Sequence, residues 1–198
     1  MPRLRCLPVV FLSMSCWGQA ADDNAELKEI YQADQADRTG ASVDWAKVGP
    51  RDAARQQRVR AMLDGGQVIT GKDYERAAMV YQHGEGSDDI LLAHVLAVTA
   101  IGKGNLDARW LSAATLDRLL HRLKQPQVFG TQFQRNAGGP WTMEPYNRAL
   151  LGAALREASC VPEEKDQIAR LEALRRGEEP KPPARWPCAR QPAKPAAR

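Results

Sequence analysis

The stretch Ser87–Gly102 reads SDDILLAHVLAVTAIG, and ten of the twelve residues at positions 90–101 are apolar. Ser87 can cap the start of a helix, and the glycines in the GKGN that follows favour its end. A helix that is apolar on all sides must be enclosed by other elements, and this one is shorter than the ~20 apolar residues that cross a bilayer. The stretch therefore predicts the buried central helix, over about residues 88–102, of a single, mainly α-helical domain.

Further helices are expected on both sides of this segment. Thr70 and Asp73 have the spacing of a capping box at the start of a helix that runs to His83. The short Gly-Glu-Gly that follows predicts an antiparallel helical hairpin with the central helix. Residues 127–134, QVFGTQFQ, place β-prone side chains around a glycine and predict a small β-hairpin over about 127–143. The other expected helices cover residues 25–38, 50–63, 106–124, 145–158 and 162–176.

The beginning of the chain has the pattern of a secretory leader. Arg3 and Arg5 precede a short apolar run, and the Gly-Gln-Ala at 18–20 has the small-x-small pattern of a cleavage site. The alternative is a lipoprotein leader acylated at Cys16, which lacks the usual leucine three positions before the cysteine. We expect residues 1–20 to be a signal peptide and the mature chain to be exported, periplasmic or secreted, without a transmembrane segment.

Removal of this leader leaves two cysteines, Cys160 and Cys188. In an oxidising compartment an isolated pair is most simply a disulfide, and a redox role is disfavoured because no Cys-x-x-Cys is present. We expect the bond to pin a Pro-rich tail, residues 177–198, to a helical domain formed by residues 21–176. The formal net charge of +4 includes Arg3 and Arg5 of the leader and an excess of basic residues at 175–198, so the body at 21–174 is mildly acidic and no nucleic-acid partner is expected.

Familiar catalytic and cofactor signatures are missing from the sequence, which has no phosphate-binding Gly-rich loop, no His-Glu-x-x-His and no Gly-x-Ser-x-Gly. We therefore expect no cofactor and no metal. His83 is the candidate general base, because imidazole titrates near neutrality, and Asp117 is the second catalytic candidate. The candidate binding residues are Asp34, Arg38, Gln82, His83, Asp117, Arg118, Thr131 and Gln132.

Four short motifs follow one another in a recognisable order: DQADR (34–38), QH (82–83), LDR (116–118) and PQVFGTQF (126–133). In this order and spacing they resemble an uncharacterised bacterial family, domain of unknown function 6624, over about residues 25–175. The resemblance implies a mostly helical fold and implies that the polar positions belong together. It implies no activity.

The same residues also have purely structural interpretations. Asp117 and Arg118 can form an ordinary ion pair, since a carboxylate near a core is costly unless it is paired. His83 can cap the C-terminus of a helix. Thr131 and Gln132 can form hydrogen bonds with a helix end.

Two functions from different classes remain. The first is a non-enzymatic binding or interaction protein of the cell envelope with a protein partner, including an inhibitor or immunity factor. The second is a metal-independent hydrolase in which His83 is the general base, Asp117 orients it or holds the substrate, and Arg118 and Gln132 bind an anionic or carbonyl group. The hydrolase requires His83 and Asp117 to share one cleft.

Overall fold

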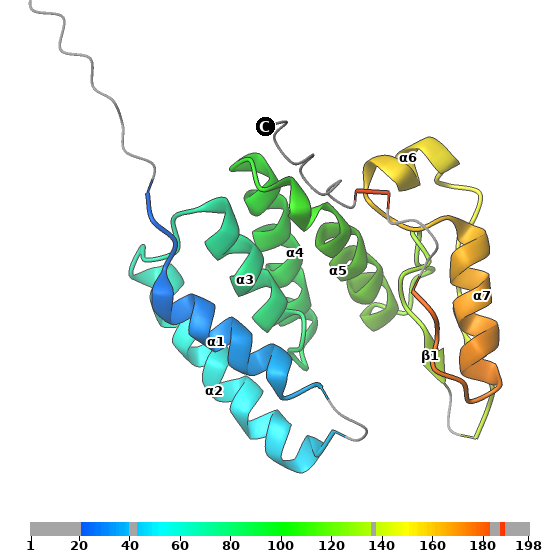
Figure 1. Ribbon diagram of the computed structural model, residues 1–198, viewed down its shortest axis with the longest axis horizontal. Helices are drawn as coiled ribbons and strands as arrows, with labels where there is room; N and C mark the ends of the chain where they lie inside the picture. The colour runs from blue at the N-terminus through cyan, green and yellow to red at the C-terminus, as the bar shows by residue number, and fades with distance from the viewer. Residues whose placement is uncertain (1–20, 40–42, 136–137, 183–186, 189–198) are drawn as a thin grey trace, which may run out of the picture.

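The computed structural model describes residues 21–39, 43–135, 138–182 and 187–188, and this part of the chain is mainly α-helical, as predicted (Figure 1). The predicted leader, including Cys16, lies outside the described residues. The elements are α1 (Ala25–Ala36), α2 (Trp45–Asp64), α3 (Gly71–Tyr81), α4 (Ser87–Gly102), the short 3-10 helix η1 (Leu106–Ala108), α5 (Arg109–Arg122), β1 (Gln134–Arg135), β2 (Trp141–Thr142), α6 (Ala153–Ala158) and α7 (Glu164–Arg175).

The central helix is confirmed as α4, which has α3 on one side and α5 on the other (Figure 1). Its N-cap is Gly86, whose backbone N–H donates to the Asp89 carboxylate at 3.2 Å. The start of α3 is likewise confirmed, because the Thr70 hydroxyl and the Asp73 carboxylate each accept a hydrogen bond from the other residue's backbone. The capping box therefore fixes the beginning of α3 in the sequence itself, whereas Ser87, the expected cap of the central helix, is instead the first residue of α4.

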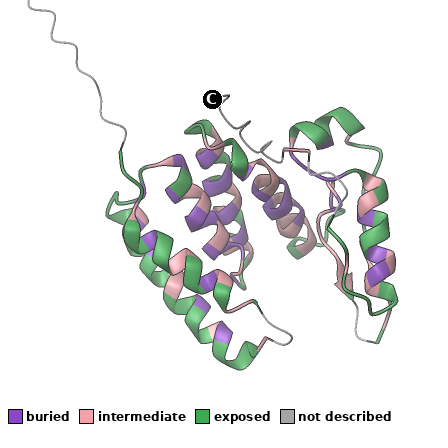
Figure 2. Ribbon diagram, in the orientation of Figure 1, coloured by how far each residue is buried: buried purple, intermediate pink, exposed green. Residues whose placement is uncertain are grey.

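The expectation that α4 is enclosed on all sides is wrong. Leu91, Val95 and Val98 are 46%, 51% and 49% exposed and form one stripe along the helix. The opposite side is buried against α3 and α5, so the described part of the chain covers one face of α4 (Figure 2). Within the described part of the chain, no helix is long and apolar enough to cross a membrane.

The predicted β-hairpin is much shorter than expected. Only Gln134–Arg135 pairs with Trp141–Thr142, in antiparallel register, and residues 127–133 form an irregular loop. The helix predicted over residues 145–158 is reduced to Ala153–Ala158, because the backbone on either side of Tyr146 bonds instead to Gln127.

Two further helix boundaries differ from prediction. The helix α2 begins at Trp45, so Pro50 lies inside it rather than in its first turn. The segment 106–124 is divided into η1 and α5, which ends at Arg122.

The predicted disulfide between Cys160 and Cys188 is present, with an S–S distance of 1.97 Å and 5.1 Å between the Cα atoms. It attaches the middle of the C-terminal tail to the turn that follows α6.

The buried core has two parts. The larger part lies among α1 to α5, and the smaller part, around Met143, Tyr146 and Leu171, joins the hairpin region to α7. The loop at 127–133 runs between these two parts and brings its polar side chains to the side of α5.

Candidate functional site

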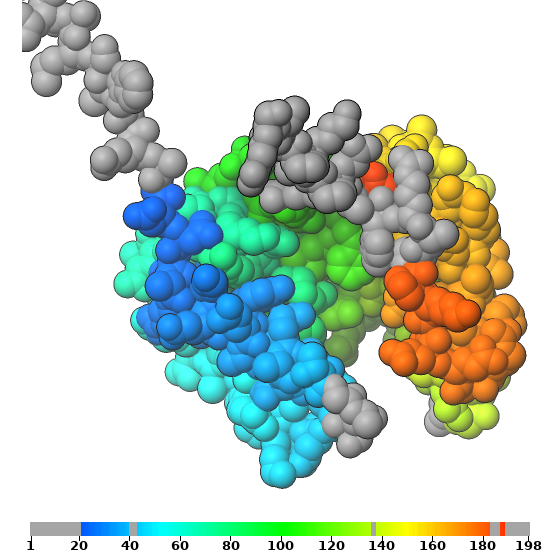
Figure 3. All heavy atoms as spheres, viewed as in Figure 1, coloured from blue at the N-terminus to red at the C-terminus, as the bar shows by residue number. Residues whose placement is uncertain are grey.

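An open cleft of about 610 Å³ lies where four segments of the chain meet. The space-filling view shows the surface hollowed between the α1–α2 side and the side that carries β1 and α7 (Figure 3). Its walls come from the end of α1 with α2, the α3–α4 turn, α5, and the segment that leads into β1. Five of the predicted binding residues line it: Arg38, Gln82, His83, Arg118 and Gln132.

His83 is held by a buried carboxylate that the sequence did not pair with it. Its Nδ1 lies 3.1 Å from Oδ1 of Asp34, which is fully buried on α1. Since a carboxylate only accepts, Nδ1 carries the proton and the Nε2 of a neutral ring keeps its lone pair. Within the described ranges His83 Nε2 has no hydrogen-bond partner, and it is not sealed by protein atoms.

The negative charge of Asp34 is compensated by the guanidinium of Arg38. Arg38 donates to Asp34 Oδ1 at 3.0 Å and to Asp52 Oδ2 at 2.6 Å. Arg55 also forms ion pairs with Asp52 and Asp37. These alternating ion pairs form a ladder that joins the end of α1 to α2. Each arginine of this ladder has a carboxylate partner.

Asp117 lies outside this cleft, fully buried beneath the loop at 127–133. Its Oδ1 accepts from the backbone N–H groups of Val128 and Phe129 at 2.8 and 3.0 Å. Its Oδ2 accepts from the backbone N–H and the hydroxyl of Thr131 at 2.9 and 2.8 Å. A carboxylate with four such bonds anchors the loop, and the hydrolase condition that His83 and Asp117 share a cleft is not met.

The glycine of this loop is required by its geometry. Gly130 has φ of +71°, and a Cβ there would lie 2.8 Å from the ring of Tyr146. Only a residue without a side chain lets the loop close over Asp117 at this point.

Arg118 points its guanidinium to neutral acceptors. Its Nη1 donates to the carbonyl of Gln82 at 2.6 Å, and its Nε donates to Oε1 of Gln132 at 3.2 Å. The predicted ion pair with Asp117 is not formed, and in the described part of the chain Arg118 has no carboxylate partner. Burial lowers the pKa of Arg118, and the neighbouring charges of Arg122 and Arg38 lower it further.

The side chains of Thr131 and Gln132 connect Arg118 to the loop. The Gln132 amide nitrogen donates to the carbonyl of Ala114, inside α5, and to the Thr131 hydroxyl, both at 3.1 Å. These two residues therefore contact the side of a helix rather than its end.

His121, which is not among the predicted binding residues, also lines the cleft. It follows Arg118 by three positions on α5, and this helical spacing is the signal that places both on one face. Its Nε2 is the one buried side-chain nitrogen or oxygen in the described ranges that has no hydrogen-bond partner. Burial lowers the pKa of His121, and the charge of Asp117 opposes this shift.

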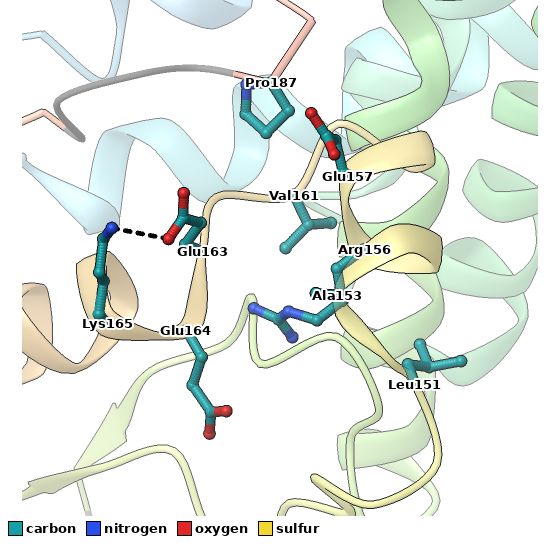
Figure 4. A pocket seen from close by; sticks show the side chains of 9 residues that line it. All are labelled: Leu151, Ala153, Arg156, Glu157, Val161, Glu163, Glu164, Lys165 and Pro187. Atoms are coloured by element: carbon teal, nitrogen blue, oxygen red, sulfur yellow. Dashed lines mark ion pairs between the residues drawn. The ribbon is translucent and has the colours of Figure 1, made fainter.

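A second cavity, of about 400 Å³, lies beside the disulfide and contains none of the predicted residues (Figure 4). Leu151, Val161 and Pro187 line it together with Arg156 and an ion pair between Glu163 and Lys165. The Arg156 guanidinium is committed to structure, because it donates to carbonyls and side chains that connect the loop, α6 and α7.

Among the described residues, no group of three or more His, Cys, Asp or Glu could hold a metal ion. Comparison of the chain with protein-family models, with curated proteins and with solved structures found no match. The resemblance to domain of unknown function 6624 therefore stays a prediction.

Proposed function

We propose that the protein is a non-enzymatic binding protein of the cell envelope that holds part of a protein partner in the cleft. The observation that carries the proposal is the convergence of five predicted polar residues, from segments far apart in the sequence, on one open cleft. Its volume of about 610 Å³ lies within the range typical of ligand sites. Inhibitors and immunity factors are examples of this class.

The polar groups of the cleft suit recognition more directly than chemistry. Arg38 and Arg118 are held in place by partners of their own, and among the described residues that line the cleft there is no serine, threonine or cysteine to act as a nucleophile. A rigid set of donors favours binding, since little side-chain freedom is lost when a ligand arrives.

Site-specific photo-crosslinking in cells tests this proposal. A photoreactive residue in place of Glu85, which is exposed at the cleft, should join the mature protein to one discrete envelope protein. The same residue in place of Glu29, exposed on α1 and not part of the cleft lining, is the matched control. Equal crosslinking at both positions would contradict the proposal. The proposal would also be contradicted if the protein isolated from cells still carried residues 1–20.

The alternative is a hydrolase in which Asp34 takes the role first given to Asp117. The favouring observation is the 3.1 Å contact of His83 Nδ1 with buried Asp34, because it leaves Nε2 free to take a proton from water. Arg118 and Gln132 would bind the anionic or carbonyl group. A panel of peptides and esters, incubated with wild type and with His83→Gln, tests this alternative: hydrolysis must disappear in the variant.

A further inference from the structure

We propose that the cleft binds an oxyanion through Arg118, and that Gln132 is the positioning residue that keeps Arg118 oriented without neutralising it. The inference rests on the proposed binding function, because it names the chemical group that the same cleft would take from its partner. Two sources can supply that group: a carboxylate of the partner protein, or a phosphate.

The first step concerns the hydrogen-bond donors that Arg118 has left for a ligand. Two of its three nitrogens are used, Nη1 on the carbonyl of Gln82 and Nε on Oε1 of Gln132. Nη2 has no hydrogen-bond partner in the described residues. A guanidinium fixed at two corners presents its third nitrogen to the cleft that it lines.

The second step is the charge. A partly buried cation is costly unless a counter-ion compensates it. The nearby Arg38 and Arg55 have carboxylate partners, whereas the acceptors of Arg118 in the described ranges are neutral. Burial is the main cause of the lowered pKa of Arg118, and repulsion by the charges of Arg122 and Arg38 lowers this pKa further. An oxyanion in the cleft would compensate both the burial of the Arg118 charge and its repulsion by Arg38 and Arg122.

The third step is the orientation of Gln132. Its amide nitrogen donates to Ala114 and to Thr131, so its oxygen must face Arg118. Thr131 is in turn bonded to buried Asp117, which extends this chain of contacts into the core. Glutamate at position 132 would supply the counter-ion from the protein itself and would leave no charge for a ligand.

The test is a titration of the folded, ¹⁵N-labelled mature protein, followed by NMR, with acetate in one arm and inorganic phosphate in the other. The side-chain signals of Gln132 and Arg118 should shift and saturate in the millimolar range. Gln132→Glu and Arg118→Gln should each weaken binding by about tenfold or more, because a charge-assisted hydrogen bond is lost. Lys124→Gln, an exposed charge just beyond α5 and not part of the cleft lining, is the control and should change affinity by less than about threefold.

Stronger binding of acetate supports a carboxylate from the partner, and stronger binding of phosphate supports a phosphorylated one. The proposal is overturned if neither anion saturates the wild type, or if a folded Gln132→Glu variant binds as the wild type does. The same variants distinguish failure of the oxyanion proposal from failure of the proposed protein-binding function. Crosslinking at position 85 that persists in Arg118→Gln contradicts the oxyanion alone, whereas anion binding without crosslinking contradicts the protein partner alone.

Discussion

At the scale of the residue, Asp34 and Asp117 are both fully buried carboxylates with different surroundings. Asp34 faces side chains, two of which line the cleft, whereas Asp117 faces mainly the backbone of one loop. The sequence could indicate that both were special, because charged residues lie there among apolar ones. It could not assign their partners, since His83 is 49 positions from Asp34 and Thr131 is 14 from Asp117.

Asp117→Asn should be strongly destabilising. The amide group brings a donor to a place where four donors already converge, so loop N–H groups lose their acceptor. We expect a loss of about 3 kcal/mol or more in the free energy of unfolding, which lowers the melting temperature by roughly 6–12 °C. His83→Ala is the comparison: Asp34 keeps Arg38 and Gln35, so the loss should stay within about 1 kcal/mol. Similar melting temperatures for the two variants would contradict the assignment of Asp117 as the anchor.

His121 should make the stability of the protein sensitive to acid. Burial holds the pKa of the folded His121 below its ordinary value of 6.5, so the unfolded chain binds the proton more tightly. The free energy of unfolding contributed by this group therefore falls as the pH drops below about 6.5, until the lowered pKa is passed. In His121→Leu, the melting temperature should differ less between about pH 7.5 and about pH 5.5 than in wild type. An identical pH dependence in both proteins would refute this prediction.

At the scale of the element, the helices with local signals were predicted well. The capping box at Thr70 and the apolar run of α4 are complete within a few residues, so their boundaries follow from the sequence. The β-prone side chains of residues 127–133 predict a strand, whereas the structure has an irregular loop there. Its conformation is set by a carboxylate on another element, and no periodicity in the loop itself carries that information.

The two faces of α4 should respond differently to substitution. Leu96 is 3% exposed in the core, and Leu96→Ala should cost about 2–5 kcal/mol because it leaves a cavity. Its neighbour Val95 is 51% exposed, and Val95→Ser should change stability by about 0.5 kcal/mol or less. Thermal denaturation of both variants measures the difference. A large loss in Val95→Ser would mean that the exposed stripe is covered in solution.

At the scale of the whole molecule, the sequence predicted the class of fold and most members of the cleft, but not its shape. The cleft is formed where the ladder on α1 and α2 faces α5 and the loop, and such an arrangement depends on how helices pack. The disulfide was predictable, because only two of the four cysteines lie outside the predicted leader.

Cys188→Ser should lower the stability of the mature protein. The bond closes a loop between residues 28 positions apart, and chain entropy sets an upper limit of roughly 3–4 kcal/mol on its contribution. The melting temperature of the variant should match that of wild type treated with a reducing agent. Equal stability of the oxidised wild type and the variant would show that the tail contributes nothing to the fold.

The anchoring of the loop by Asp117 has a consequence for hydrogen exchange. The amide protons of Val128, Phe129 and Thr131 lie in no helix or strand, yet each is bonded to a fully buried carboxylate. They should exchange with deuterium at rates close to those of the core helices. Because Thr131 also supports Gln132, these three protons report whether the cleft is assembled, before any ligand for it is known.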